Sequence, residues 1–192
     1  MPTTQQLLVH KSDFLADKEK SIQIIENNIQ YPLIAKPVDD GCSSAVKKIK
    51  NGSDLRAYLL ALFRENSIVD EVNRLQLGLQ YKEEFPIKNA ALIEALIDKK
   101  DAVHFLEITG GLLTKYNSEG KIEYEIFEPS EALSSGEVLS LEEKFLAGEG
   151  QNITPARYTV AEIEADYTQI AQQVKASLKK AAKALNVTGY AR

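Results

Sequence analysis

The chain has 192 residues, of which 44% are hydrophobic and 27% charged, and its formal net charge is −5. This composition is typical of a globular protein with a substantial core, and the negative charge argues against a general surface for nucleic acid or anionic membranes. One cysteine allows no disulfide within the chain, no run of residues is long enough for a membrane span, and the N-terminus lacks a secretion signal. We therefore expect a cytoplasmic protein.

Hydrophobic periodicity predicts an α+β protein in which antiparallel strand pairs predominate. In chain order, the expected elements are a strand at Leu7–Val9, a helix over Lys11–Asn28, strands at Leu33–Ala35 and Val46–Lys50, a helix over Asp54–Glu65, strands at Ile68–Asp70, Ala90–Ile97, His104–Tyr116 and Ile122–Phe127, and a helix over Val160–Asn186. Ser53 is the expected N-cap of the second helix, and Asn117–Gly120 has the composition of a hairpin turn. The segment Glu71–Lys82 is ambiguous, and Ser134–Thr154 has the composition of a long surface loop.

The most informative segment is the predicted hairpin formed by the strands at Leu33–Ala35 and Val46–Lys50, together with the turn between them. Lys36 stands at the end of the first strand, because Pro37 has no N–H with which to continue the ladder. Gly41 can adopt a positive φ, and Cys42 and Ser43 add small side chains and backbone N–H groups; a concave run of such groups can bind an anion. A lysine before a proline is, on its own, more often a solvated charge. The segment contains neither G-x-x-x-x-G-K-[ST] nor G-x-G-x-x-G.

Other titratable residues give weaker signals. His10 and His104 have no partners at ligand spacing, so no metal site is expected within the chain. The acidic pair Asp39-Asp40 should shape the turn rather than bind a metal.

Together with motifs downstream, the hairpin resembles the phosphate-binding hairpin of the ATP-grasp ligases, and within them the D-alanine–D-alanine ligase branch. That branch has a strand ending in Val-Lys-Pro followed by Gly-Ser-Ser, and here Ala35-Lys36-Pro37 precedes Gly41-Cys42-Ser43 at matching spacing. The resemblance runs from about Leu33 to Arg192. It implies a truncated ATP-grasp fold, in which two α+β lobes with antiparallel sheets clasp ATP: a small ATP-binding lobe over about 20–97 and an incomplete larger lobe over about 98–192, with an ω-like loop over 134–154.

The resemblance also implies roles for individual residues. Lys36, Gly41, Cys42, Ser43 and Lys144 would bind the phosphates of ATP; Glu94, the backbone of Ala95, Leu96 and Ile97, and Glu107 would bind the nucleoside; and Arg192, Lys144 and Ser43 would be catalytic. From the residues alone, Glu94 would face solvent in an ordinary alternating strand, and Lys144 could equally be a mobile surface lysine.

By the same resemblance, the whole enzyme would use ATP and Mg²⁺ to convert a D-alanine carboxylate into an acyl phosphate that an amine attacks, in peptidoglycan and cell-wall synthesis. Phe145 replaces the tyrosine of dipeptide-forming ligases, which leaves D-lactate open as second substrate. Magnesium ligands are expected beyond Arg192, so the chain alone is expected to lack ligase activity. Two alternatives stay open: a degenerate nucleotide-binding or interaction module, and an ATP-grasp ligase with another substrate pair. ATP and small molecules are the expected partners, nucleic acid and membranes are not, and a homodimer of the full-length protein is left open.

Overall fold

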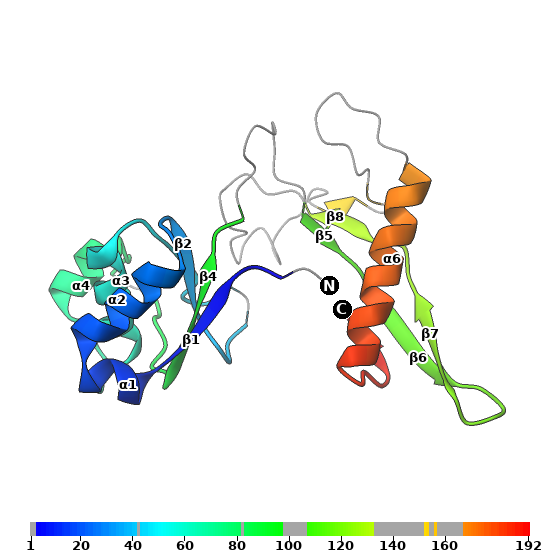
Figure 1. The fold of residues 1–192 in the computed structure, drawn as a ribbon, viewed down its shortest axis with the longest axis horizontal. Helices are drawn as coiled ribbons and strands as arrows, with labels where there is room; N and C mark the ends of the chain where they lie inside the picture. The colour runs from blue at the N-terminus through cyan, green and yellow to red at the C-terminus, as the bar shows by residue number, and fades with distance from the viewer. Residues whose placement is uncertain are drawn as a thin grey trace. The chain divides into compact units, whose positions relative to one another are not determined.

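The computed structural model describes residues 3–41, 43–81, 83–97, 107–132, 152–153, 156 and 167–192. Contacts divide the chain into two compact units, Pro2–Ile97 and Asp98–Arg192, and Met1 is grouped with the second. We call them the N-terminal unit and the C-terminal unit and describe each by itself (Figure 1). Within the described ranges, no helix combines the length and the apolar character that crossing a bilayer requires.

In the N-terminal unit, helices cover one side of an antiparallel sheet (Figure 1). Its strands are β1 (Gln6–His10), β2 (Leu33–Pro37), β3 (Lys47–Ile49) and β4 (Ala90–Ala95), in the spatial order β1-β4-β2-β3. Its helices are α1 (Lys11–Ala16), α2 (Lys18–Asn28), α3 (Gly52–Leu62) and α4 (Glu71–Gln76). Strand β4 lies between β1 and β2 in the sheet, so it pairs with two strands that are distant from it in the sequence.

Alternating side chains turn one face of this sheet toward the core. The buried core includes Val9, Leu33, Ala35, Ile49, Ala91 and Ile93 from the strands and Phe14, Ile22, Ile25, Leu55, Tyr58, Leu59 and Leu62 from the helices. The opposite face, which we call the open face, carries the residues between them: Gln6, Leu8, Ile34, Lys36, Lys48, Leu92 and Glu94. All of these open-face side chains are partly or fully exposed, so the open face is accessible within this unit.

Some predicted boundaries in this unit were wrong. The helix expected over Lys11–Asn28 is two helices, because Asp17 is extended, ends α1 and caps α2 by accepting the Lys20 N–H. Helix α3 is capped by Asn51 rather than Ser53, since the Asn51 side chain accepts the Asp54 N–H. No strand forms at Ile68–Asp70; Asp70 instead caps α4, which begins the segment that the pattern left ambiguous.

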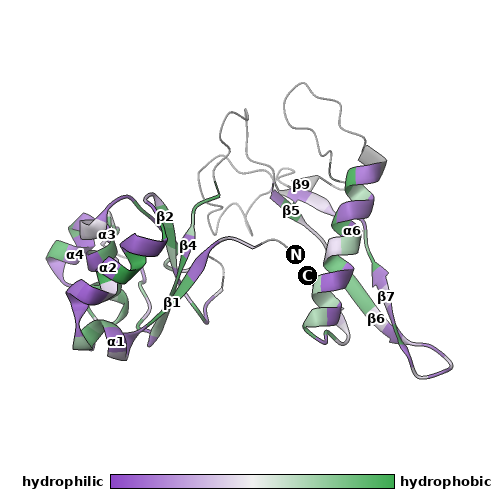
Figure 2. Cartoon of the chain, in the orientation of Figure 1, coloured by the Kyte–Doolittle hydropathy of each residue, from purple (hydrophilic) through white to green (hydrophobic). Residues whose placement is uncertain are grey.

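The C-terminal unit contains two small antiparallel sheets and a long helix. One sheet has the order β10-β6-β7, with β6 (Leu112–Tyr116), β7 (Ile122–Ile126) and β10 (Tyr190–Ala191); the other has the order β5-β8-β9, with β5 (Glu107–Thr109), β8 (Ser130–Ala132) and β9 (Asn152–Ile153). Helix α6 (Tyr167–Ala184) contacts β7. Hydrophobic and hydrophilic stretches alternate along α6 (Figure 2), as expected for a helix with one packed side.

The strand predicted over His104–Tyr116 is interrupted. Its described part forms β5 and β6, which belong to different sheets and are separated by Gly110 and Gly111; residues 104–106 lie outside the described residues. The hairpin turn at Asn117–Gly120 is confirmed, with β6 and β7 paired on either side. Most of the loop expected over 134–154, and residues 160–166 of the expected last helix, also lie outside the described residues.

Gly110 marks a close approach between this break and α6. A Cβ atom at Gly110 would lie 2.4 Å from Leu178 Cδ1. We expect Gly110→Ala to destabilise the C-terminal unit by about 1 kcal/mol, because the end of the Leu178 side chain must move aside. Urea denaturation followed by circular dichroism measures the change. In a Leu178→Ala background the same alanine should cost little, and an equal cost in both backgrounds would contradict this packing.

Candidate functional site

Lys36 and Glu94 meet on the open face of the N-terminal sheet. Glu94 lies opposite Ile34 in the β2–β4 ladder, and Lys36 is two residues further along β2, so the two side chains share a face. Lys36 Nζ is 2.6 Å from Glu94 Oε2, and the side chains are 34% and 19% exposed. Ion pairs at such exposure contribute about 0–1 kcal/mol, so an arriving anion can compete for the lysine. The structure thus brings together two of the residues singled out in the sequence.

Strand β2 continues further than predicted. It pairs with β3 only at Leu33–Ala35, but it pairs with β4 as far as Pro37, which lies opposite Ala91. The pairing with β3 therefore ends before Pro37, whereas the pairing with β4 includes it. Lys36 is therefore held inside a strand pair rather than at a free strand end.

Apolar side chains surround the ion pair on the open face. Leu8 and Leu92 lie opposite each other in the β1–β4 ladder, and Ile34 lies opposite Glu94 in the neighbouring one. Leu8 is 52% exposed, so this apolar surface is accessible. An apolar surface with a few placed charges is the composition of a small-molecule site.

One backbone N–H group at the end of β4 already has a hydrogen-bond partner. The Ala95 N–H is donated to Gln5 O at 2.9 Å, so it is not available to a ligand in this structure. Leu96 and Ile97 follow β4, and Ile97 is 60% exposed. Of the three backbone positions expected to contact a base, Leu96 and Ile97 are those beyond the strand.

The tip of the β2–β3 hairpin is a defined turn. The Ser44 N–H donates to Gly41 O at 2.9 Å, and the Gly41 N–H donates to Asp40 Oδ1 at 2.9 Å. The positive φ angles are 58° at Ser43 and 51° at Ala45, whereas Gly41, which could adopt one, does not. Turn hydrogen bonds and the Asp40 carboxylate, rather than glycine, set this geometry. Cys42 lies outside the described residues.

The remaining predicted site residues belong to the C-terminal unit. Glu107 begins β5 and is exposed, and Thr109 lies on the same face of that strand. Arg192 follows β10, and its Nε donates to Thr109 Oγ1 at 3.5 Å, so Arg192 lies beside the strand that carries Glu107. Lys144 and Phe145 lie outside the described residues. In the part of the chain that the structure describes, no three His, Cys, Asp or Glu side chains gather as a metal site requires.

Sequence reasoning missed Lys88. Its ammonium group lies 3.2 Å from Asp39 Oδ1 and 3.3 Å from Asp40 Oδ2. The bond to Asp39 raises the pKa of Lys88, and the Gly41 N–H lowers the pKa of the Asp40 carboxyl with help from Lys88. Lys88 lies just before β4, and no local sequence motif there indicates that it binds a turn distant in the sequence. The prediction that Asp39-Asp40 shapes the turn agrees with this geometry.

A depression of about 680 Å³ lies beside α4 and the segment after it, and it reaches the turn at Asp40 and Ser44. Neither Lys36 nor Glu94 lines it. The hollow is therefore distinct from the open face on which the ion pair lies.

Comparison with known proteins identifies relatives of the chain. A family model described as the C-terminus of D-ala D-ala ligase matches residues 1–76. The D-alanine–D-alanine ligase of Caldicellulosiruptor bescii is 27% identical over 157 residues, which cover 82% of this chain and 34% of that protein. The ligase of the same name from Leptospira interrogans is 24% identical over 184 residues, covering 96% of this chain and 42% of that protein. The chain thus spans between a third and a half of the length of these relatives.

Solved structures show the same fold. The VanG D-Ala:D-Ser ligase from Enterococcus faecalis superimposes with a TM-score of 0.60 at 18% identity, covering 99% of this chain and 42% of that one. D-alanyl-alanine synthetase A from Vibrio cholerae gives a TM-score of 0.52 at 15% identity, covering 99% of this chain and 45% of that one.

These likenesses define the class of protein: the chain has the ATP-grasp fold, and the α+β prediction with antiparallel sheets is confirmed. Within that class, the chain is similar to D-alanine–D-alanine ligases over part of their length. The family model also takes in residues 1–32, which the motif analysis left outside the resemblance.

Proposed function

We propose that the chain binds ATP and forms part of an ATP-dependent carboxylate–amine ligase of the D-alanine–D-alanine type. The observation that carries the proposal is the Lys36–Glu94 pair on an accessible sheet face that also carries Leu8, Ile34 and Leu92. A triphosphate would take Lys36 from Glu94, because three charged phosphate groups attract an ammonium more strongly than one carboxylate. The freed Glu94 would then accept a hydrogen bond from the base.

The surroundings of the pair fit the rest of a nucleotide. Leu8, Ile34 and Leu92 would offer an apolar surface to a flat ring, and the backbone of Leu96 and Ile97 would bond its edge. In the C-terminal unit, Glu107 would bind the ribose hydroxyls. The roles of Gly41, Cys42, Ser43 and Ala95 in nucleotide binding stay predictions.

Phosphoryl transfer needs positive charge where the phosphates react. We propose that Lys144 and Arg192 supply it, with Ser43 at the turn. The ligase would also use Mg²⁺ to neutralise phosphate oxygens. The described residues do not form a site for that ion, and the expectation that its ligands lie beyond Arg192 stays a prediction.

Relatives named for joining D-alanine to D-alanine support a D-alanine carboxylate as the first substrate. The second substrate stays open between D-alanine and D-lactate, on the evidence of Phe145, and another acid and amine would use the same ATP site. A nucleotide-binding module without ligase chemistry would share that site too. A ligase assay of the whole protein with ATP, Mg²⁺, D-alanine as the acid and either D-alanine or D-lactate as the second substrate separates these outcomes. A homodimer, a cytoplasmic location and the lack of nucleic-acid or membrane partners also stay predictions.

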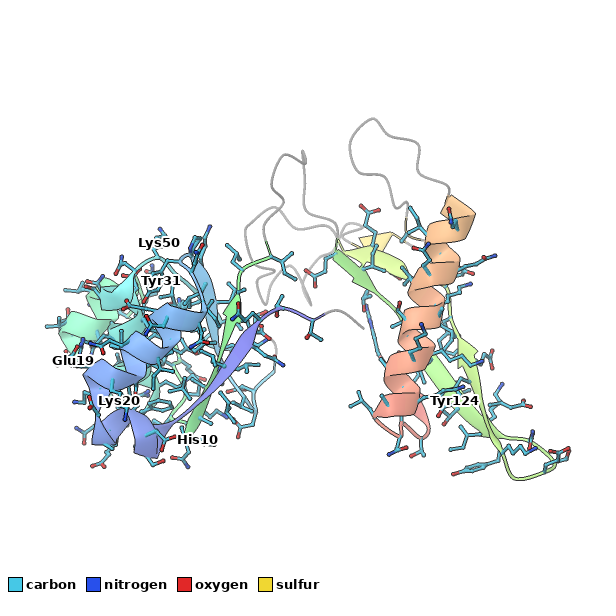
Figure 3. All side chains as sticks on the ribbon, viewed as in Figure 1. His10, Glu19, Lys20, Tyr31, Lys50 and Tyr124 are labelled. Carbon is cyan, nitrogen blue, oxygen red and sulfur yellow. The ribbon has the colours of Figure 1, made fainter. Side chains whose placement is uncertain are left out.

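Calorimetric titration with a non-hydrolysable ATP analogue, with and without Mg²⁺, tests nucleotide binding. We expect the wild-type chain to bind, and Lys36→Ala to weaken binding by roughly ten- to a hundredfold, as loss of a charge-assisted contact predicts. Lys20→Ala is the matched control, because Lys20 is an exposed lysine on α2, on the helical side of the same unit (Figure 3). Equal losses in the two variants, or no loss in Lys36→Ala, would count against the proposed site.

A further inference from the structure

Both limbs of the β2–β3 hairpin are tied to one neighbouring segment. We call residues 83–88, which lead toward β4, the strap. Lys88 in the strap binds the acidic pair Asp39 and Asp40 at 3.2 and 3.3 Å, at the end of the first limb. Glu83 in the strap binds Lys47 in the second limb at 2.9 Å. The strap therefore holds the turn from two sides with charges of opposite sign.

The strap is itself fixed to the end of α3. Arg64 donates to Phe85 O at 2.6 Å and to Pro86 O at 3.1 Å, and the Lys88 N–H donates to Leu62 O at 2.9 Å. These hydrogen bonds to the strap backbone leave little freedom in where the Lys88 side chain begins. The Lys88 side chain is 20% exposed, so most of its length is covered by neighbouring residues.

Helix α3 reaches the turn directly as well. The buried Tyr58 packs edge-on against Phe85 with ring centroids 5.6 Å apart, and its hydroxyl group donates to Ala45 O at 3.0 Å. One helix thus sets the position of both the strap and the turn.

The charges on this turn create a problem for an anion. Asp40 keeps the turn in shape by accepting the Gly41 N–H, yet Asp39 and Asp40 place two carboxylates beside the position where phosphates would approach. Like charges at such range repel, and a cation in contact with both carboxylates cancels most of that field. Lys88 is that cation.

We propose that Lys88 is a positioning residue for the phosphates of a nucleoside triphosphate: it fixes Asp39 and Asp40 and neutralises them. The inference rests on the proposed function, because it names what prepares the phosphate-binding turn of the same site. Lys88 acts through the two aspartates and need not touch the nucleotide.

Titrations of the full 192-residue chain with a non-hydrolysable ATP analogue and with adenosine test this role. Lys88→Ala should weaken the triphosphate about tenfold and leave adenosine unchanged. Lys88→Arg should retain most of the affinity. Adding Asp39→Asn and Asp40→Asn to Lys88→Ala should restore binding, because an asparagine oxygen still accepts the Gly41 N–H without the charge. Lys121→Ala, which breaks an exposed pair with Glu119, is the control.

An unchanged triphosphate affinity in Lys88→Ala, an equal loss for adenosine, or no rescue by the asparagines would overturn the positioning role. A wild-type chain that binds neither ligand would overturn the proposed function instead. A ligand-free measurement then still decides the role of Lys88: amide exchange at Gly41, followed by nuclear magnetic resonance, should be faster by about threefold or more in Lys88→Ala. The Gly120 amide, which donates to Asn117 O, should not change, and an unchanged Gly41 rate would refute the proposal.

Discussion

Replacing Arg64 by leucine is expected to destabilise the N-terminal unit by about 2–4 kcal/mol, because several partly buried carbonyls would lose their donor at once. The Arg64 guanidinium donates to four carbonyl oxygens, which belong to Ala61, Ser67, Phe85 and Pro86. It thereby joins the end of α3 to two separate segments. Burial lowers the pKa of Arg64, which is the cost of keeping this charge partly out of water.

Urea denaturation monitored by circular dichroism measures the Arg64→Leu effect. Arg56→Leu is the matched control, since the Arg56 guanidinium binds the exposed Glu19 and should cost about 0.5 kcal/mol or less. Similar midpoints for the two variants would show that the carbonyl cluster contributes nothing special to stability.

Phe14→Ala is expected to cost about 3–5 kcal/mol, the range for removing a large side chain from a packed core. Phe14 is fully buried, and its ring centroid lies 5.8 Å from that of Phe63. The neighbouring Leu15 is 47% exposed on the same helix, so Leu15→Ala should cost far less. Thermal unfolding of both variants measures the difference, and comparable losses would mean that α1 does not pack on this core as described.

Much of the fold could be predicted because buried and exposed residues alternate regularly along the strands. Residues 33–35 and 90–95 show the buried and exposed rhythm of strands with one face in a core, and the prediction found both. Helix starts were harder, because asparagine, serine and aspartate are all good caps and the sequence near α3 offers Asn51 and Ser53 only two residues apart. The break at Gly110 and Gly111 did have a signal, since paired glycines inside a strand pattern favour a bend.

The candidate site could be predicted only in part. The resemblance singled out Lys36 and Glu94, but their contact depends on β2 pairing with a strand that enters from far along the chain. The sequence pattern did not indicate roles for Lys88 and Arg64, because they bind turn carboxylates and backbone carbonyls rather than residues at a fixed spacing. Such contacts depend on tertiary structure, which periodicity does not encode.

The position of β4 in the sheet has a consequence for how the protein is made. Strands β1 and β2 do not pair with each other; both pair with β4, in which Glu94 is the partner of Gln6 and of Ile34. Until the ribosome has delivered β4, the sheet consists of the β2–β3 hairpin alone, and an isolated two-stranded hairpin is marginally stable at best. Non-local pairing of this kind also slows folding. Lys36 and Glu94 can come together only when β4 enters the sheet, so this ion pair forms in the same step that completes the sheet.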